Sequence, residues 1–446
     1  MNSLFGTSGI RGSAKTLLTN QFCFDIGRSF AKFLAGYGQK GMVAVGQDSR
    51  ESSPRIKKAF SLGLVEGGYK VVDQGITPVP SINYLLIVNP DFVGGCMITG
   101  SHIRSDFNGL KFFAFKEEIL KKHEEEIQKI YEQIKEKVPF EEKGGAMENK
   151  ETALRAYREM LLGLAKKPYS KWKVIVDAGN GCQGKIMPSL LETLGFNVIT
   201  INNDLNPEKF IPRDTETEEA VKELQKAVRD NGADLGLAFD GDGDRVVFVD
   251  ENERFIPGDY IGALIGKYSV SPLIVTPINT SQVVETIGKP VLRTKVGSPY
   301  VIEAMKKNKA TFGFEANGGG ISAEVMMSRD AGSTTIKILN LLKQTQKTLG
   351  ELVDTLPRFS IYRTKVDCPR ELNQTFIKRA KKEFKGVRTE EMDGLKIWLD
   401  DSSWLLFRPS SNAPEFRVFA EAENAENAEK IGKKGIDFIK SLLILK

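Results

Sequence analysis

A group of metal-ligand side chains falls within residues 240–245. Asp240, Asp242 and Asp244 alternate with glycines, and Arg245 follows them directly. Carboxylates held this close repel one another unless a cation neutralises them, and hard cations such as Mg²⁺ take oxygen ligands. An EF-hand calcium loop has carboxylates at the same offsets, but Arg245 stands where that loop needs glycine. A solvated acidic turn is the plain alternative, and the spacing favours a metal site beside an anion-binding arginine.

A serine with two proton-transferring neighbours follows an apolar run. Residues 92–98 predict a buried strand, and residues 110–115 predict the next one. Ser101 and His102 lie between the two strands, and Lys111 lies in the second. A serine in such a loop can act as a nucleophile, and histidine or lysine can move its proton. The alternative is a polar turn with Asn108–Gly109 at its tip, and this pattern supports both interpretations equally.

Two later loops carry groups that suit sugars or phosphates. Residues 313–320 contain Glu315 and Asn317, whose side chains can bond sugar hydroxyls, among glycines that permit close backbone approach. Residues 408–417 combine arginine, serine and asparagine donors that can wrap a phosphate. These donors are Arg408, Ser410, Ser411, Asn412 and Arg417. Taken alone, the first loop is more typical of a plain turn, and the second fits a capped hairpin loop equally well.

A further anion-binding candidate lies near the N-terminus. Residues 5–12 place three glycines around a threonine, a serine and Arg11. The spacing matches neither a P-loop nor a dinucleotide fingerprint, so it implies no nucleotide.

The elements that would position these loops repeat a strand–turn–helix–strand pattern. The predicted strand pairs are 42–46 with 70–73, 173–177 with 197–202, and 272–276 with 291–294. Strands joined through a helix form parallel α/β units with right-handed crossovers. The last part of the chain differs, because short strands precede one long helix and predict an antiparallel sheet. These strands are 395–399, 403–408 and 416–422, and the helix is 424–443.

The sequence therefore predicts an α/β fold class, with three related α/β domains plus a C-terminal α+β domain. We place the domains at residues 1–145, 146–252, 253–357 and 358–446. A charged amphipathic helix is expected over 117–135 and a linker over 139–150.

Bulk composition excludes several classes of protein. The 446 residues are 41% hydrophobic and 27% charged, which is typical of a globular chain. A net charge of +5, without basic runs between aromatic residues, argues against nucleic acid as a partner. Four scattered cysteines predict reduced thiols rather than disulfides or a zinc site. With no membrane-spanning stretch and no secretory signal, we expect a cytoplasmic protein.

Taken together and in this order, the five segments resemble the α-D-phosphohexomutase family. The resemblance runs from Phe5 to beyond Ala422, and D-G-D-G-D-R and the serine loop ending in N-G-x-K are its specific parts. The stretch 315–319 is most similar to archaeal-type phosphoglucomutase/phosphomannomutase members, with phosphoglucosamine mutase a close relative. The resemblance implies four domains around a central active-site cleft.

The resemblance also implies residue roles. Ser101 would be a phosphoserine, and its phosphate would share one Mg²⁺ with Asp240, Asp242 and Asp244. The residues around the transferred phosphoryl group would be Arg11, His102, Lys111 and Arg245. Glu315 and Asn317 would read sugar hydroxyls. The non-reacting phosphate would be bound by Arg408, Ser410, Ser411, Asn412 and Arg417.

The implied reaction interconverts hexose 1-phosphate and hexose 6-phosphate, of glucose and/or mannose, through phosphoserine and a hexose 1,6-bisphosphate intermediate. Lys111 is the leading candidate for general acid–base catalysis, with His102 as its partner. Alternatives are a phosphoglucosamine mutase, a phosphohydrolase or bisphosphate synthase using the same site, and a non-catalytic sugar-phosphate-binding relative. Sugar phosphates would be the partners, without nucleic acid or membrane, and the protein would be a monomer or homodimer.

Four places depart from the family pattern. Ile103 stands where asparagine usually follows the Ser–His pair, and Gln47 replaces a usual arginine. Gly319 takes the place of a histidine found in bacterial-type members, so no role of that histidine carries over. The phosphate loop has Ser-Asn-Ala at 411–413 where Gly-Thr-Glu is common, and it thereby loses an acidic residue.

Overall fold

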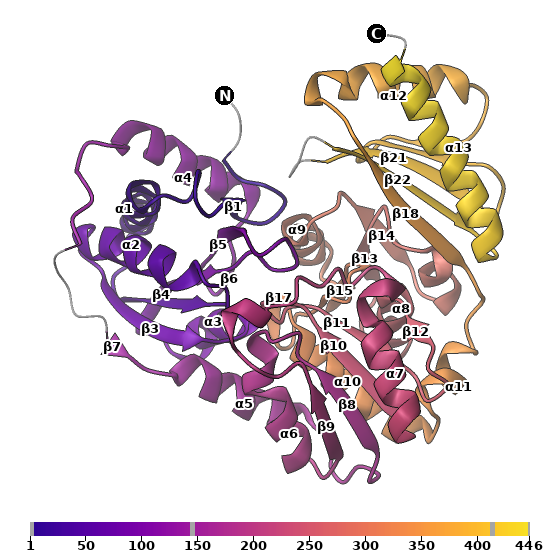
Figure 1. The fold of residues 1–446 in the computed structure, drawn as a ribbon, viewed down its shortest axis with the longest axis horizontal. Coiled ribbons are helices and arrows are strands. Elements are labelled where there is room, and N and C mark those ends of the chain that lie inside the picture. Colours follow the sequence, from indigo (N-terminus) through magenta and orange to yellow (C-terminus); the bar gives the residue numbers. More distant parts are fainter. Residues whose placement is uncertain (1–3, 143–147, 411–414, 445–446) are drawn as a thin grey trace.

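The computed structural model describes residues 4–142, 148–410 and 415–444, which form four sheets. Figure 1 shows the N-terminal part in indigo and purple at the left and the C-terminal sheet in yellow at the upper right. The second and third sheets lie between and below them. This arrangement agrees with the predicted α/β class ending in a smaller, different unit.

The first sheet has the order β1-β5-β4-β2-β3-β7, with β6 on β5. Its strands are β1 (Ile10–Ser13), β2 (Met42–Gln47), β3 (Lys70–Ile76), β4 (Phe92–Ile98), β5 (Phe107–Ala114), β6 (Glu117–Glu118) and β7 (Glu148–Asn149). Its helices are α1 (Asn20–Gly36), α2 (Ser53–Glu66), α3 (Val79–Val88) and α4 (Lys121–Ile134). The predicted parallel pairing of 42–46 with 70–73 is confirmed by β2 and β3.

The second sheet has the order β12-β11-β10-β8-β9. Its strands are β8 (Lys173–Asp177), β9 (Asn197–Ile201), β10 (Leu235–Phe239), β11 (Val246–Val249) and β12 (Phe255–Ile256). The helices along this part of the chain are α5 (Thr152–Leu164), η1 (Cys182–Lys185), α6 (Met187–Thr193), η2 (Pro207–Lys209), η3 (Glu218–Val221) and α7 (Lys222–Asn231). The predicted parallel pair is again present as β8 and β9.

The third sheet has the order β14-β13-β15-β16-β17, and β13 and β14 form the last predicted parallel pair. Its strands are β13 (Ile274–Pro277), β14 (Val291–Thr294), β15 (Phe312–Phe314), β16 (Gly320–Ser322) and β17 (Met326–Arg329). The helices are α8 (Gly258–Tyr268), η4 (Gln282–Ile287), α9 (Ser298–Asn308), α10 (Ala331–Thr345) and α11 (Leu349–Val353).

The fourth sheet is antiparallel throughout, as predicted, with the order β18-β22-β21-β20-β19. Its strands are β18 (Ser360–Asp367), β19 (Thr389–Glu390), β20 (Leu395–Trp398), β21 (Trp404–Pro409) and β22 (Glu415–Ala422). Its helices are η5 (Arg370–Leu372), α12 (Asn373–Glu383) and α13 (Ala425–Ile444).

Two short strands lie just beyond the first two predicted domain boundaries and pair with strands that precede them. β7 pairs with β3, so the first sheet continues beyond residue 145 into the predicted linker. β12 pairs with β11, so the second sheet continues beyond residue 252. Strands of two residues carry too little alternation for a sequence pattern to reveal them. The boundaries themselves stay a prediction.

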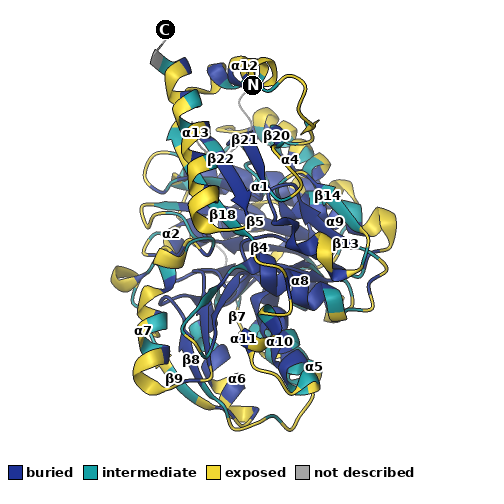
Figure 2. Ribbon diagram, turned by 90° about the vertical axis from the view of Figure 1, so that its right-hand side faces the viewer, coloured by how far each residue is buried: buried dark blue, intermediate teal, exposed yellow. Residues whose placement is uncertain are grey.

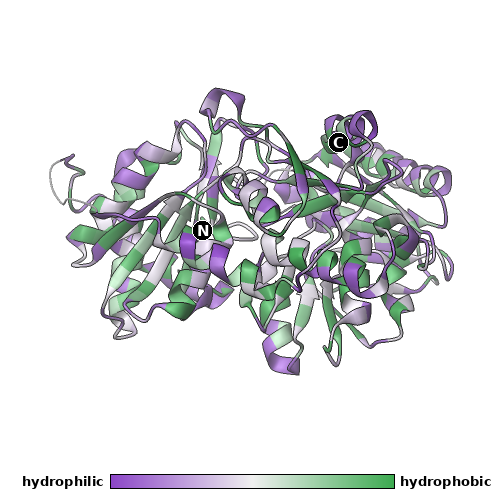
Figure 3. Ribbon diagram, turned by 90° about the horizontal axis from the view of Figure 1, so that it is seen from below, coloured by the Kyte–Doolittle hydropathy of each residue, from purple (hydrophilic) through white to green (hydrophobic). Residues whose placement is uncertain are grey.

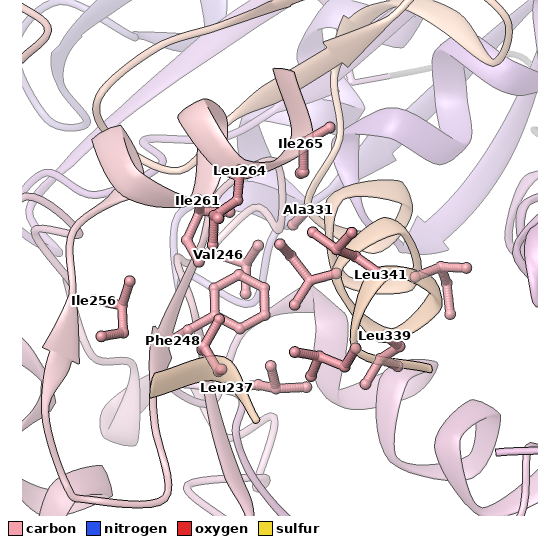
Figure 4. Packing of buried hydrophobic residues seen from close by; sticks show 14 of the residues in the cluster. Leu237, Val246, Phe248, Ile256, Ile261, Leu264, Ile265, Ala331, Leu339 and Leu341 are labelled. Atoms are coloured by element: carbon pink, nitrogen blue, oxygen red, sulfur yellow. The ribbon is translucent and has the colours of Figure 1, made fainter. Parts of the chain in front are cut away.

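The core follows the strands. Figure 2 shows the strands mostly in dark blue, with yellow exposed residues on the outer faces of helices such as α7 and α13. Figure 3 shows green hydrophobic residues along the strands and purple hydrophilic residues on outer helical turns. We call each sheet together with the helices along its part of the chain a unit. One hydrophobic cluster is shared by the second and third units, and Figure 4 shows part of it around Val246, Phe248, Leu264 and Leu339. This shared core fixes β10 and β11, which carry the acidic loop between them.

Among the described residues, we find no helix that combines the length and the apolar character needed to cross a membrane. The four cysteines are all buried and free of disulfides.

Candidate active site

The candidate site is assembled from loops that join antiparallel strands. The serine loop connects β4 to β5, the acidic loop connects β10 to β11, and the loop with Glu315 connects β15 to β16. The loop with Arg408 connects β21 to β22, and four of its residues, 411–414, lie outside the described residues. Ser411 and Asn412 fall in this gap.

Ser101 is fully buried and has a left-handed backbone with φ of 51°. A non-glycine residue in this conformation costs roughly 1–2 kcal/mol, which surrounding contacts must offset. The Ser101 amide donates to Thr99 Oγ1 at 2.7 Å, which supports the turn from one side. The conformation turns the hydroxyl toward the acidic loop.

The serine and acidic loops meet directly. Ser101 Oγ donates to Asp240 Oδ2 at 2.8 Å, although 139 residues separate them in the chain. Ligand oxygens of Asp240, Asp242 and Asp244 lie within 4.8 Å of one another, and all three residues are buried. The structure therefore brings together the four residues that the sequence proposes as metal ligands.

Charge in the acidic loop is unevenly balanced. Burial, together with the charges of Asp242 and Asp244, raises the pKa of Asp240 well above its usual value. Burial alone would also raise the pKa of Asp244, but the charges of Arg329, Lys111 and Arg245 outweigh burial and hold that pKa below its usual value. Without a further cation, the loop therefore favours one protonated carboxyl group beside an ionised one.

The donor set fits a hard divalent cation. Asp242 Oδ1 and Asp244 Oδ1 are buried and have no hydrogen-bond partner among the described residues. Buried carboxylate oxygens without a partner are costly, and a cation coordinated by oxygens removes that cost. The other oxygen of each carboxylate contacts protein cations. The two Oδ1 atoms remain available to a metal, with Arg245 Nε 3.7 Å from that of Asp244.

Lys111 and Arg329 contact the Oδ2 atoms of these carboxylates. Lys111 Nζ donates to Asp242 Oδ2 at 3.4 Å and forms a shorter contact with Asp244 Oδ2. Arg329 Nη2 donates to the same Asp244 oxygen at 2.9 Å. Lys111 comes from β5 in the first sheet and Arg329 ends β17 in the third. The carboxylate of Asp244 thus ties three sheets together.

His102 and Arg245 stand beside the serine. Arg245 Nη1 lies 3.0 Å from His102 Nδ1, and Ser101 Oγ lies 3.3 Å from the same nitrogen. Burial and the charges of Arg245, Arg11 and Arg329 lower the pKa of His102 well below its usual value. A neutral ring with Nδ1 accepting from Arg245 carries its proton on Nε2. Ser101 Oγ lies closer to Asp240 Oδ2, at 2.8 Å, than to His102 Nδ1.

Arg11 reaches the serine loop from β1. Its Nη1 donates to Gly100 O at 3.4 Å, and β1 pairs with β5 so that Arg11 is opposite Gly109. Asn108 and Gly109 therefore lie within a strand, and the interpretation of them as the tip of a turn is wrong. The Asn108 side chain donates to Ser52 Oγ and Ser53 Oγ, which holds this strand beside α2.

Glu315 and Asn317 are both buried, and each has a different environment. Glu315 Oε2 accepts from Arg329 Nη1 at 2.8 Å. Asn317 Oδ1 accepts from Gly319 N at 3.2 Å, and its carbonyl accepts from Thr215. Arg329 thereby joins this loop to the acidic loop.

Arg329 is the main site residue that our sequence analysis missed. It lies in Ser328-Arg-Asp330, next to the Asp330 that caps α10, and no local pattern distinguishes it from a structural arginine. Only the structure reveals that Arg329 packs against Gly319, where a Cβ atom would lie 2.6 Å from Arg329 Cδ. The Arg329 side chain therefore fills the space beside Gly319.

Arg408 and Ser410 line a cavity of about 510 Å³. Phe5 and Thr7 of the N-terminal loop, Lys121 of α4, and Lys295 and Tyr300 from the third unit also line it. Arg408 Nε donates to Asp393 Oδ2 at 2.7 Å, and Arg417 is paired with Glu415. Lys295 is a second residue that the sequence analysis did not single out.

Comparison with known proteins identifies the family. Three models of phosphoglucomutase/phosphomannomutase match in order: alpha/beta/alpha domain I at residues 2–138, domain II at 155–254 and domain III at 257–359. The chain belongs to the phosphoglucomutase/phosphomannomutase family. The predicted family, the α/β fold class and the prediction of an isomerase-class phosphotransferase are therefore confirmed.

Relatives of similar length support this assignment. The phosphoglucomutase/phosphomannomutase of Thermococcus kodakarensis is 35% identical over 99% of this chain and 100% of its own. A probable phosphoglucosamine mutase of Methanopyrus kandleri is 32% identical over 99% of this chain and 98% of its own. A crystal structure of a family protein from Burkholderia thailandensis shares the fold, with a TM-score of 0.83, 24% identity and coverage of 99% and 98% of the two chains.

Proposed function

We propose that this member of the family interconverts hexose 1-phosphate and hexose 6-phosphate, with glucose and/or mannose as the sugar. Phosphoserine 101 would transfer its phosphoryl group to the free hydroxyl of the sugar phosphate and give a hexose 1,6-bisphosphate. The other phosphate would then return to Ser101. The observation that carries this proposal is the 2.8 Å contact between Ser101 Oγ and Asp240 inside a buried cluster of three carboxylates.

The proposed metal is one Mg²⁺, held by Asp240, Asp242 and Asp244 together with the serine phosphate. When bound, it would neutralise charge on the transferred phosphoryl group, which is the main requirement of phosphoryl transfer. The two carboxylate oxygens without protein partners support this assignment.

Side chains of the protein would bind the phosphoryl group and transfer the proton. Arg245, close to both His102 and the acidic loop, would bind the phosphoryl oxygens beside Ser101. Lys111 is the candidate that returns a proton to Ser101 Oγ when the serine leaves, since its ammonium lies in the same buried cluster as the carboxylates that Ser101 meets. Neutral His102 is its partner, and Arg11 would bind the phosphoryl group from the β1 side.

The sugar and its second phosphate would be held across the site. Glu315 and Asn317 would bond sugar hydroxyls, and the non-reacting phosphate would sit in the 510 Å³ cavity beside Arg408, Ser410 and Lys295. Burial of Ser101 keeps water from the phosphoserine. Cytoplasmic sugar phosphates are the partners that the proposal requires.

Conversion of sugar phosphates tests the proposal. Purified protein with Mg²⁺ and a catalytic amount of hexose 1,6-bisphosphate should convert glucose 1-phosphate or mannose 1-phosphate to the 6-phosphate. Phosphorus NMR measures this conversion. No conversion of any hexose phosphate would overturn it. Inorganic phosphate or released bisphosphate as the main product would instead support the phosphohydrolase or bisphosphate synthase.

A phosphoglucosamine mutase is the second candidate, because a relative with 32% identity is described as a probable one. Glucosamine differs from glucose at C2, where an amine replaces the hydroxyl. Comparing kcat/KM for the three sugar 1-phosphates in one assay decides between the candidates.

A further inference from the structure

The serine loop is held from beneath by a buried guanidinium. Arg50 follows β2 and is 1% exposed. Its Nη2 donates to the carbonyls of Ser101 at 2.8 Å and Ile103 at 2.6 Å. Its Nη1 donates to the carbonyls of Arg104 at 2.6 Å and Phe107 at 3.0 Å. Four backbone carbonyls of one loop thus converge on a single side chain.

The fifth donor completes the set. Arg50 Nε donates to Asp48 Oδ2 at 3.1 Å, and the same oxygen accepts from the Gly100 amide at 3.2 Å. A guanidinium has five N–H donors in a rigid plane, and all five are used. Asp48 and Arg50 therefore hold the backbone on both sides of the Gly100–Ser101 peptide bond.

Arg50 also touches the unit that carries the acidic loop. The ring of Phe210, which follows η2, lies 4.3 Å from Arg50 Cζ at its centroid. A cation over an aromatic face is attracted by the ring quadrupole, and the attraction is stronger when both groups are desolvated. The same side chain that holds the serine loop thus packs against the second unit.

Burying a cation is expensive, and a well-packed apolar residue is often as stable as a buried ion pair. Fold stability alone therefore does not account for a guanidinium at this place. Its donors end on the carbonyl of the strained residue itself, since Ser101 has a left-handed φ. We propose that Arg50 is a positioning residue that holds the backbone of Ser101 so that its hydroxyl faces the acidic loop. The inference rests on the proposed phosphoserine function.

The test is a single-turnover measurement. The full-length protein, dephosphorylated, is mixed with Mg²⁺ and hexose 1,6-bisphosphate, and the gain of one phosphoryl group is followed by intact mass. Arg50→Lys keeps the charge but lacks the planar fork. We expect its rate constant for Ser101 phosphorylation to fall about 10²-fold, the cost of a small misplacement of reacting groups. The Kd for hexose 1-phosphate, measured by calorimetry, should not change.

The rate constant distinguishes mispositioning of Ser101 from loss of folded protein. In a partly unfolded sample a smaller fraction of the protein is phosphorylated, but the rate constant of that fraction is unchanged. Arg55→Lys is the matched control: Arg55 also donates to a carbonyl, that of Ala14 at 2.6 Å, but is exposed and away from the serine. It should behave as wild type. An unchanged rate constant in folded Arg50→Lys, or a Kd weakened as much as the rate, would overturn the proposal.

Gly100→Ala gives a second route that leaves the Arg50 side chain chemically unchanged. A Cβ atom at Gly100 would lie 2.7 Å from Arg50 Cζ, so the guanidinium must move. The same fall in rate constant is expected, and a wild-type rate would overturn the proposal. If neither variant folds, Arg50 is a structural residue only and the proposal fails. If wild type itself takes no phosphoryl group, it is the proposed function that fails.

Discussion

The junction between the serine loop and the acidic loop (the junction) differs from the loop proposed to bind the second phosphate (the phosphate loop) in how its polar side chains are paired. At the junction, Ser101, Lys111 and the three aspartates are at most 2% exposed, and their hydrogen bonds run between units. At the phosphate loop, Arg408 bonds to Asp393 and Arg417 bonds to Glu415, both within the fourth unit. Arg408 also borders a cavity that three units line. The first region is buried and keeps two carboxylate oxygens without a hydrogen-bond partner among the described residues, whereas the second borders an open cavity.

The difference indicates which part of the reaction is prepared in advance. Preorganised charges reduce the cost of rearrangement during phosphoryl transfer. In the proposed reaction a sugar bisphosphate presents each end to Ser101 in turn, which needs a wider space. A tight junction combined with an open cavity meets both needs, and the predictions below test each of the two regions.

Ser101→Ala should have the largest effect. Without the hydroxyl no phosphoenzyme forms, so turnover should fall by at least about 10³-fold, as expected when a covalent carrier is removed. Coupled assay of hexose 6-phosphate formation and intact mass measure the two effects. Ser105→Ala, an exposed serine of the same loop, is the control and should keep full activity. Substantial activity in Ser101→Ala would break the comparison, since the junction would then not be the reacting centre.

The sequence predicts much of the tight region and little of what stabilises it. Alternating aspartates and a serine between strands are local patterns, so the ligand set and the loop are visible in the sequence. Arg50 and Arg329 are not, because their role depends on contacts 51 and 85 residues away. The three parallel strand pairs follow from turn and helix spacing. The short edge strands β7 and β12 do not, because two residues show no period.

Metal removal should have the next largest effect. Chelated protein should lose turnover, and Mg²⁺ at 100 times its Kd should stabilise the fold by about 2.7 kcal/mol. Thermal unfolding with and without Mg²⁺ measures the change. Asp242→Asn should abolish the shift, because it alters a carboxylate with a free oxygen, whereas Asp230→Asn on exposed α7 should retain it. Equal shifts in both variants would mean that the junction does not hold the metal.

Arg408→Ala should affect the open region alone. Loss of one charged hydrogen bond to the substrate phosphate costs about 2 kcal/mol, which is roughly a 30-fold rise in KM. The rate of Ser101 phosphorylation at saturating bisphosphate should stay near that of wild type. Arg388→Ala, exposed in the same unit, is the control. A fall in the saturated rate with an unchanged KM would show that the two regions are not separate.

The smallest effect concerns how the fourth unit is attached. Lys396 is 1% exposed between the rings of Trp398 and Trp404, and its Nζ donates to Ile278 O of the third unit at 3.2 Å. Burial, with the nearby charge of Arg293, lowers the pKa of Lys396 to about 7 from 10.5. Between about pH 7 and 10.5, Lys396 is protonated in the unfolded chain and neutral in the folded chain. Wild type therefore loses stability relative to Lys396→Met as the pH falls from about 10 to 7.

The slope should approach about 1.4 kcal/mol per pH unit in that window and vanish below it. Urea unfolding of both proteins at several pH values measures this slope. Lys385→Met, which alters an exposed lysine of the same unit, should track wild type at every pH. A difference between Lys396→Met and wild type that does not vary with pH would mean that Lys396 stays charged in its aromatic pocket. The contact between the third and fourth units would then include a cation buried between two aromatic rings.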